Sequence, residues 1–79
     1  MGDLPRPSGK EMVRFLRQQG FELVRVRGSH HYLERQGLKT SVPVHGNQIL
    51  KIGTLRGILR DVQLSPAEFR QRWQQGGSS

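Results

Sequence analysis

The sequence contains no cysteine. This absence excludes a disulfide framework, the thiolate ligand sets of zinc fingers and cysteine nucleophiles. A small domain without disulfides is expected in the cytoplasm, because small secreted domains usually need such cross-links. No apolar run approaches the roughly 20 residues of a transmembrane helix, and residues 1–10 lack the apolar segment of a signal peptide. We therefore expect one cytoplasmic domain over residues 1–79, with a core over about 4–69 and a flexible tail over 74–79.

Acidic residues are also scarce. Six Asp and Glu stand against 13 Lys and Arg, which gives 79 residues a formal net charge of +7. This excess predicts a polyanionic partner, either a nucleic acid or an anionic membrane surface. Membrane insertion needs free apolar residues on an amphipathic helix, whereas the apolar stripes of this chain are needed for its core. A nucleic acid is therefore favoured over a membrane, and a solvated basic surface without a partner is the alternative.

Helix signals appear at both ends of the chain. Capping boxes, each a Ser followed three residues later by a Glu, open helices at residues 8–11 and 65–68. Gly20 ends the first helix. Between these two helices the chain has a third segment with apolar residues at helical spacing. Thr54 is the expected N-cap of this helix, and a start near Lys51 is the alternative. The last helix is expected to be short.

Three strands are predicted between the first two helices, over about 21–27, 30–35 and 38–44. Two-residue turns at Gly28-Ser29 and Gln36-Gly37 join them and fix which residues lie opposite one another. Both turns give the same two faces, since directly opposed residues share a face. The apolar face is predicted to hold Val24, Val26, His31, Leu33, Leu38, Thr40 and Val42. The polar face is predicted to hold Arg25, Arg27, His30, Tyr32, Glu34, Lys39 and Ser41.

The resulting order, α-β-β-β-α with a short C-terminal helix, indicates an α+β two-layer sandwich in which helices cover one face of an antiparallel sheet. Pro43 cannot donate a ladder hydrogen bond, which favours an edge position for the third strand. So small a body leaves no room for a deep pocket around a large cofactor, and we expect none.

The histidines are the best candidates for chemistry, because imidazole titrates near neutral pH. His30 and His31 are adjacent, so on a strand they point to opposite faces and do not both bind one metal ion. His31 is expected to be a core or half-buried histidine on the apolar face. His30 lies on the polar face near Arg25 and Arg27, where guanidinium groups bind phosphate and imidazole moves a proton. The alternative is an exposed strand histidine without a role.

Two further features are compatible with phosphate contacts. His45 follows the third strand and either caps the loop or contacts a substrate. The start of the second helix, near Gly53 and Thr54 with Lys51 beside it, presents backbone N–H groups that bind anions, although this signal is weak alone. RNA is favoured over DNA, because a histidine without a metal cluster needs the substrate's own 2′-hydroxyl as nucleophile.

Five segments in order resemble the HicA toxin family. They are Pro5–Glu11 (PRPSGKE), Gly20-Phe21, Arg27–His31 (RGSHH), Val42–Gly46 (VPVHG) and Gly53–Arg60 (GTLRGILR). The resemblance runs from about residue 4 to residue 69. It implies a double-stranded-RNA-binding-domain-like fold. It also implies metal-independent cleavage of mRNA by the toxin of a type II toxin–antitoxin system, an endoribonuclease neutralised by a HicB-type antitoxin.

The resemblance makes the histidine of the Gly-Ser-His motif, His30, the expected catalytic residue. Tyr32, His45 or water fills the second acid–base role. The expected RNA-binding residues are Arg25, Arg27, Lys10, Lys39, Ser29, Tyr32 and His45. No metal, no membrane and no DNA are expected as partners. The alternative is a non-catalytic RNA-binding module that uses the same face to bind a duplex by its shape.

Overall fold

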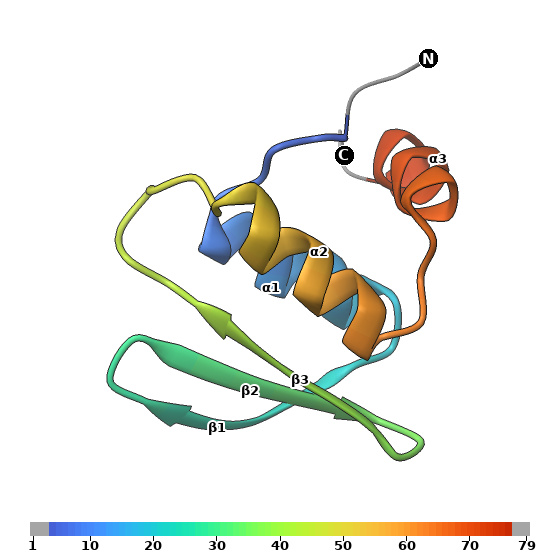
Figure 1. The fold of residues 1–79 in the computed structure, drawn as a ribbon. Coiled ribbons are helices and arrows are strands. Elements are labelled where there is room, and N and C mark those ends of the chain that lie inside the picture. The colour runs from blue at the N-terminus through green and yellow to red at the C-terminus, as the bar shows by residue number, and fades with distance from the viewer. Residues whose placement is uncertain (1–3, 77–79) are drawn as a thin grey trace.

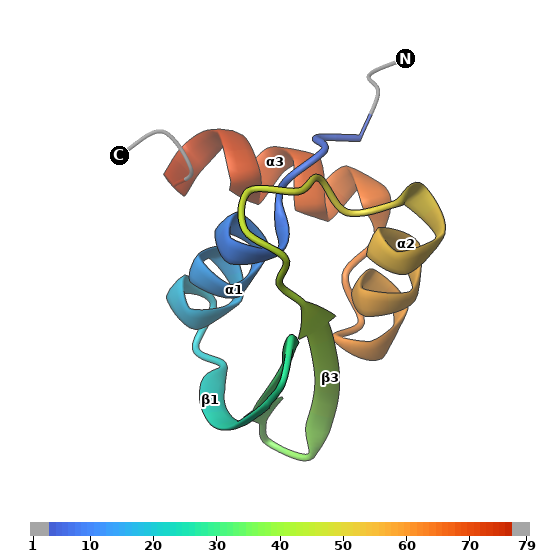
Figure 2. The same ribbon diagram turned by 90° about the vertical axis from the view of Figure 1, so that its left-hand side faces the viewer.

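The computed structural model describes residues 4–76, and these form three helices and one three-stranded antiparallel sheet. The elements are α1 (Gly9–Gln18), β1 (Glu22–Arg27), β2 (His30–Arg35), β3 (Leu38–Pro43), α2 (Ile52–Asp61) and α3 (Pro66–Gly76). Figure 1 shows α1 and α2 on one face of the sheet, while no helix of residues 4–76 lies on its other face. Figure 2 shows α3 lying across α1 and α2 on the side away from the sheet. The predicted α+β sandwich is confirmed.

The two predicted capping boxes are present. The backbone N–H of Ser8 donates to Glu11 at 2.9 Å, and the N–H of Glu11 donates to the Ser8 hydroxyl at 3.1 Å. Ser65 and Glu68 exchange the same pair of bonds, at 2.9 and 3.1 Å. The hydrogen bonds from Ser65, its backbone N–H above all, hold the pKa of Glu68 below its ordinary value of 4.5. These local bonds explain why α1 and α3 begin where the sequence predicts.

The start of α2 differs from the first expectation. Lys51 is the N-cap, and Thr54 lies inside the first turn, so the assignment of Thr54 as N-cap is wrong and the alternative start is correct. The chain just before α2 is fixed from elsewhere: the N–H of Leu50 donates to the carbonyl of Pro7 at 2.9 Å, and Arg6 donates to the carbonyl of Leu50 at 2.8 Å. Because this tertiary anchor fixes the entry point, α2 begins without a side-chain cap.

The C-terminal helix is longer than expected. α3 spans 11 residues, so residues 74–76 of the predicted tail are helical, and residues 77–79 lie outside the described residues. Its aromatic side chains pack on α1: the Phe69 ring centroid lies 5.1 Å from that of Phe15, and Trp73 lies 5.6 Å from both. Trp73 therefore contributes to the packing of α3 on α1.

The predicted register of the sheet is confirmed for β2 and β3 and for the tip of the first hairpin. His31 pairs with Val42, and Arg27 pairs with His30. Further along β1 a bulge intervenes, and Leu23, not Val24, lies opposite Leu33. A bulge adds one residue to a strand and shifts every later pair. The predicted pairing of Val24 with Leu33 is therefore wrong.

The predicted apolar face is only partly covered. Leu33 and Val42 are fully buried, but Val24 and Val26 are 46% and 50% exposed. Their assignment to a buried face is a misprediction with two causes. The bulge takes Val24 out of the ladder, and both α1 and α2 pack against β3, which lies at the opposite edge from β1. The edge position predicted for the strand that contains Pro43 is confirmed.

The core lies between the sheet and the helices, and it also holds α1 against the end of β3. The core residues are Met12, Val13, Phe15, Leu16, Phe21, Leu33, Val42, Leu50, Leu55, Ile58, Leu59, Val62 and Phe69. At Gly9 a side chain has no room: a Cβ there would overlap the carbonyl oxygen of Pro43 and lie 3.0 Å from the Cα of Val44. The first turn of α1 thus rests directly on the backbone where β3 ends. No helix within residues 4–76 is long and apolar enough to cross a membrane.

Candidate functional site

His30 lies at one end of the sheet, where several segments meet. It is the first residue of β2 and is flanked across the sheet by Arg27 on β1 and Pro43 on β3. The carbonyl of Ser29 in the preceding turn accepts a hydrogen bond of 2.7 Å from the N–H of Val44. This bond ties the β1–β2 turn to the chain that leaves β3. We call this region the His30 end of the sheet.

The side chain of His30 belongs to the sheet face that carries no helix, which we call the outer face. Tyr32 shares this face two residues along β2, with its ring centroid 6.4 Å from that of His30. The guanidinium carbon of Arg25 lies 5.1 Å from the centroid of the Tyr32 ring, within the range of a cation–π contact. Arg25, Tyr32 and His30 therefore form one row, as the register predicts.

Arg25 in this row and Arg27 opposite His30 bring positive charge to the outer face. Within residues 4–76 the one ion pair joins Lys39 to Glu34, at 4.0 Å and with both side chains well exposed. Arg25 and Arg27 are exposed and have no carboxylate among the described residues at ion-pair distance. The outer face thus presents positive charge beside His30, where a phosphate would find direct partners.

Lys39 is not part of this group. It lies opposite Glu34, four residues along β2 from His30, which is roughly 13 Å at ~3.3 Å per residue. The nearby carboxylate of Glu34 also offsets part of the positive potential at Lys39. Lys39 can contact only a nucleic acid that extends along the sheet.

Lys10 lies at the His30 end from the helix side. It is exposed in the first turn of α1, directly after Gly9, whose backbone touches Pro43. Arg14 and Arg17 continue the exposed basic ridge along α1. The structure therefore brings the start of this ridge, and not its whole length, to the end of the sheet that holds His30.

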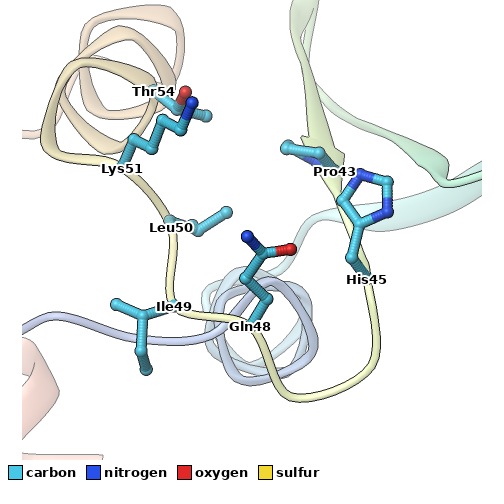
Figure 3. A pocket seen from close by; sticks show the side chains of 7 residues that line it. All are labelled: Pro43, His45, Gln48, Ile49, Leu50, Lys51 and Thr54. Atoms are coloured by element: carbon cyan, nitrogen blue, oxygen red, sulfur yellow. The ribbon is translucent and has the colours of Figure 1, made fainter.

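His45 is exposed in the loop after β3 and lines a cavity of about 300 Å³ between the end of β3 and the start of α2. We call this cavity the β3–α2 pocket. Its lining residues are Pro43, His45, Gln48, Ile49, Leu50, Lys51 and Thr54, shown in Figure 3. Lys51 and Thr54, which the sequence places at a possible phosphate site, thus share a pocket with His45.

Gln48 is the pocket residue that sequence reasoning did not identify. Its N–H donates to the carbonyl of His45 at 2.9 Å, which closes a turn through Gly46, whose φ is 56°. Glycine adopts this positive φ without strain at the first central position of such a turn. The Gly46-Asn47 pair is the local signal for the turn, but only the tertiary structure shows that residues 45 and 48 face α2.

His31 occupies the helix-covered face, as predicted. It is half-buried between Val26 and Val42, and its Nδ1 lies 3.4 Å from the carbonyl oxygen of Ser29. His30 and His31 therefore have separate surroundings. Within the described chain no group of three or more His, Cys, Asp and Glu side chains is arranged to hold a metal ion.

Comparison with known proteins identifies the relatives of this site. A family model described as the HicA toxin of bacterial toxin-antitoxin matches residues 9–64, which is 56 of the 79 residues. The comparison with curated proteins finds no match. The matched range starts with α1, includes the sheet and α2, and ends just before the capping box of α3. It therefore contains every residue of the outer face and of the β3–α2 pocket described above.

Proposed function

The chain belongs to the HicA toxin family, and from this premise we propose that it is an endoribonuclease that cleaves mRNA, with His30 as its catalytic residue. Membership of the family implies an antitoxin partner. The observation that carries the proposal is the exposed position of His30 directly across from Arg27 and in a row with Arg25. Guanidinium groups bind phosphate with two parallel hydrogen bonds, and imidazole exchanges protons near neutral pH.

The proposed reaction uses the 2′-hydroxyl of the RNA as nucleophile. A base removes the 2′-proton, the 2′-oxygen bonds to the adjacent phosphorus, and the bond from phosphorus to the 5′-oxygen breaks. An acid gives a proton to the departing 5′-oxygen. The products are a 2′,3′-cyclic phosphate and a free 5′-hydroxyl. DNA lacks the 2′-hydroxyl and is therefore not a substrate.

His30 fills one of these two proton-transfer roles. For the other role, Tyr32 is placed on the same face with its ring 6.4 Å from His30. His45 enters from the loop after β3, two residues beyond the partner of His30 on that strand. Water is the third candidate. The reaction needs no metal ion in this scheme, because cationic side chains neutralise the phosphate on which charge develops.

The RNA-binding residues follow from their distance to His30. Arg27 and Arg25 contact the phosphates nearest the scissile bond. Ser29, in the turn that leads into β2, and Lys10, at the start of α1, border the same end of the sheet. Lys39 contacts RNA that continues along the strands. Binding of this kind is directed to the backbone and carries little sequence information.

We propose that the antitoxin is of the HicB type and covers the outer face. A net charge of +7, together with two arginines beside the proposed catalytic histidine that form no ion pair within residues 4–76, favours an acidic partner at that surface. A bound antitoxin at this place would exclude RNA from His30. This arrangement accounts for neutralisation by occlusion, without a change in the toxin's fold.

A cleavage assay with end analysis tests the proposed function. Purified chain is incubated with labelled mRNA, with and without a chelator, and the product ends are identified. We expect cleavage in both conditions, with 2′,3′-cyclic phosphate and 5′-hydroxyl ends, and resistance of an oligonucleotide with 2′-deoxyribose throughout. If the chain binds RNA but does not cleave it, both with and without the chelator, the result would contradict the proposal and support the non-catalytic RNA-binding module.

A further inference from the structure

The β3–α2 pocket differs from the outer face in its shape and lining. The outer face offers cations on an exposed sheet, whereas the pocket is a concave site of about 300 Å³. This volume lies at the lower end of the roughly 300–1,000 Å³ range of small-molecule sites, so it suits one nucleotide and not a longer segment. The pocket therefore has room for a single base that has turned away from its neighbours.

The two walls of the pocket differ in the chemical groups that they present. Pro43 and His45 come from the end of β3 and the loop after it, and they supply a ring and an imidazole that can lie flat against a base. Leu50 adds an apolar surface from the segment before α2. Unstacked RNA bases are commonly held in this way, by stacking on flat side chains in a partly apolar site.

The opposite wall carries groups for a phosphate. Lys51, the N-cap of α2, and Thr54, in its first turn, both line the pocket (Figure 3). The first turn of α2 contains no acidic residue that would repel an anion. An ammonium group and a hydroxyl at this place can bind a phosphate attached to a base on the other wall.

Gln48 lies between the two walls. Figure 3 shows its side-chain amide projecting into the space between Leu50 and His45. The turn closed by the Gln48 N–H and the His45 carbonyl fixes where this side chain begins. Within residues 4–76 the amide makes no hydrogen bond to another side chain or to the backbone, which leaves its donor and its acceptor available.

We propose that the β3–α2 pocket is a subsite for one RNA nucleotide, in which Gln48 reads the edge of the base. This inference rests on the proposed function for its substrate, RNA. A carboxamide presents a donor beside an acceptor, and adenine presents the complementary pair at N6 and N7, so adenine is the base expected to bind best. Pro43 lies across from His30, which places the subsite beside the reactive histidine. Gln48 is then a specificity-determining residue for the position of cleavage.

Nucleotide binding tests the subsite without requiring cleavage. The intact isotope-labelled chain is titrated with each of the four nucleoside 3′-monophosphates and with inorganic phosphate, and its NMR spectrum is recorded. We expect adenosine 3′-monophosphate to bind most tightly, with saturable shifts of the Gln48 side-chain amide and of the Lys51 and Thr54 backbone amides. Equal affinity for all four nucleotides, tightest binding of another base, or an affinity no higher than that of inorganic phosphate would overturn the inference.

A pair of variants isolates the role of Gln48. Gln48→Ala is expected to weaken binding of the adenosine nucleotide roughly tenfold, as for the loss of one paired base contact, and to leave phosphate binding unchanged. Gln71→Ala, an exposed glutamine on α3, is the matched control and should change neither. An unchanged nucleotide affinity in a folded Gln48→Ala protein would overturn the role of Gln48.

Cleavage mapping separates this inference from the proposed function. If the chain cleaves RNA, Gln48→Ala should retain cleavage while its cut sites lose their preference for adenosine. Cleavage with no nucleotide binding in the pocket would overturn the subsite and leave the proposed function standing. Nucleotide binding in the pocket by a chain that does not cleave RNA would support the subsite and contradict the proposed function.

Discussion

Replacing Gly9 by alanine should destabilise the domain, because this position has no room for a methyl group. The Cβ of Gly9→Ala would overlap the carbonyl oxygen of Pro43 and lie 3.0 Å from both the Pro43 carbonyl carbon and the Val44 Cα. All three atoms are backbone atoms and cannot rotate away. The first turn of α1 must therefore move off the end of β3, together with Lys10 beside it.

The expected size follows from two opposing effects. Overpacking of this kind costs about 1–3 kcal/mol, while alanine in a helix gains at most about 1 kcal/mol over glycine. Because the overlap is with backbone atoms, the upper part of the overpacking range applies, about 2–3 kcal/mol, and the net loss in the free energy of unfolding is about 1–2 kcal/mol. In a domain of this size that loss lowers the melting temperature by roughly 4–16 °C.

Urea denaturation followed by circular dichroism measures this difference, with Gly57→Ala as the matched control. Gly57 lies within α2, and a Cβ there meets nothing within 4 Å. Gly57→Ala should therefore stabilise the domain by about 0.5–1 kcal/mol. A Gly9→Ala protein as stable as the wild type would refute the contact between α1 and the end of β3.

Three further predictions concern the sheet, α3 and the outer face. Leu33→Ala should cost about 2–5 kcal/mol because Leu33 is fully buried, whereas Val26→Ala at a half-exposed position should cost under about 1 kcal/mol; equal losses in urea denaturation would contradict the exposed position of β1. Hydrogen bonds from Ser65 depress the pKa of Glu68. Their contribution to the stability of the folded protein is therefore fully present above the ordinary pKa of 4.5, and it is lost as the pH falls through the lower pKa that Glu68 has in the folded state. The melting temperatures of the wild type and Glu68→Gln should therefore converge on acidification, and a constant difference would count against these bonds. Arg27→Ala should reduce the salt dependence of binding to a non-cleavable 2′-deoxy RNA analogue by about 0.7–0.9 log units per log salt; an unchanged slope would mean that Arg27 contacts no phosphate.

The second hairpin shows how much of the fold the sequence contains. Gln36 and Gly37 both adopt positive φ, 49° and 85°, as a two-residue turn of type I′ requires. With the turn fixed, the alternation of side chains determines the faces of β2 and β3. The position of His30 on the outer face is correct for the same reason, since only one residue separates Gly28 from the start of β2.

The first hairpin shows where local patterns fail. Leu23 and Val24 are both apolar, so the alternation of apolar and polar residues does not decide which of them faces the core. The bulge turns Leu23 toward the core, and no glycine or other turn residue in β1 predicts it. The exposure of Val26 depends on where the helices pack, which is a tertiary property.

In the candidate site, too, some residues are placed by local turns and others by tertiary contacts. Residues within one hairpin, such as Arg27 and His30, are placed together by the turn between them. The β3–α2 pocket is formed by a loop and a helix start that tertiary anchors hold in place, through the bond from Leu50 to Pro7 and from Arg6 to Leu50. The presence of Gln48 and Lys51 in one cavity therefore had no signal in the sequence pattern.

The most direct test compares the two neighbouring histidines in the RNA cleavage assay. His30→Ala removes the imidazole of the outer face, and His31→Ala removes the half-buried imidazole on the helix-covered face. Both proteins are first shown to be folded by circular dichroism. The account predicts that His30→Ala loses cleavage while still binding RNA, and that His31→Ala retains cleavage. A folded His30→Ala protein that cleaves RNA at the wild-type rate would contradict the central claim.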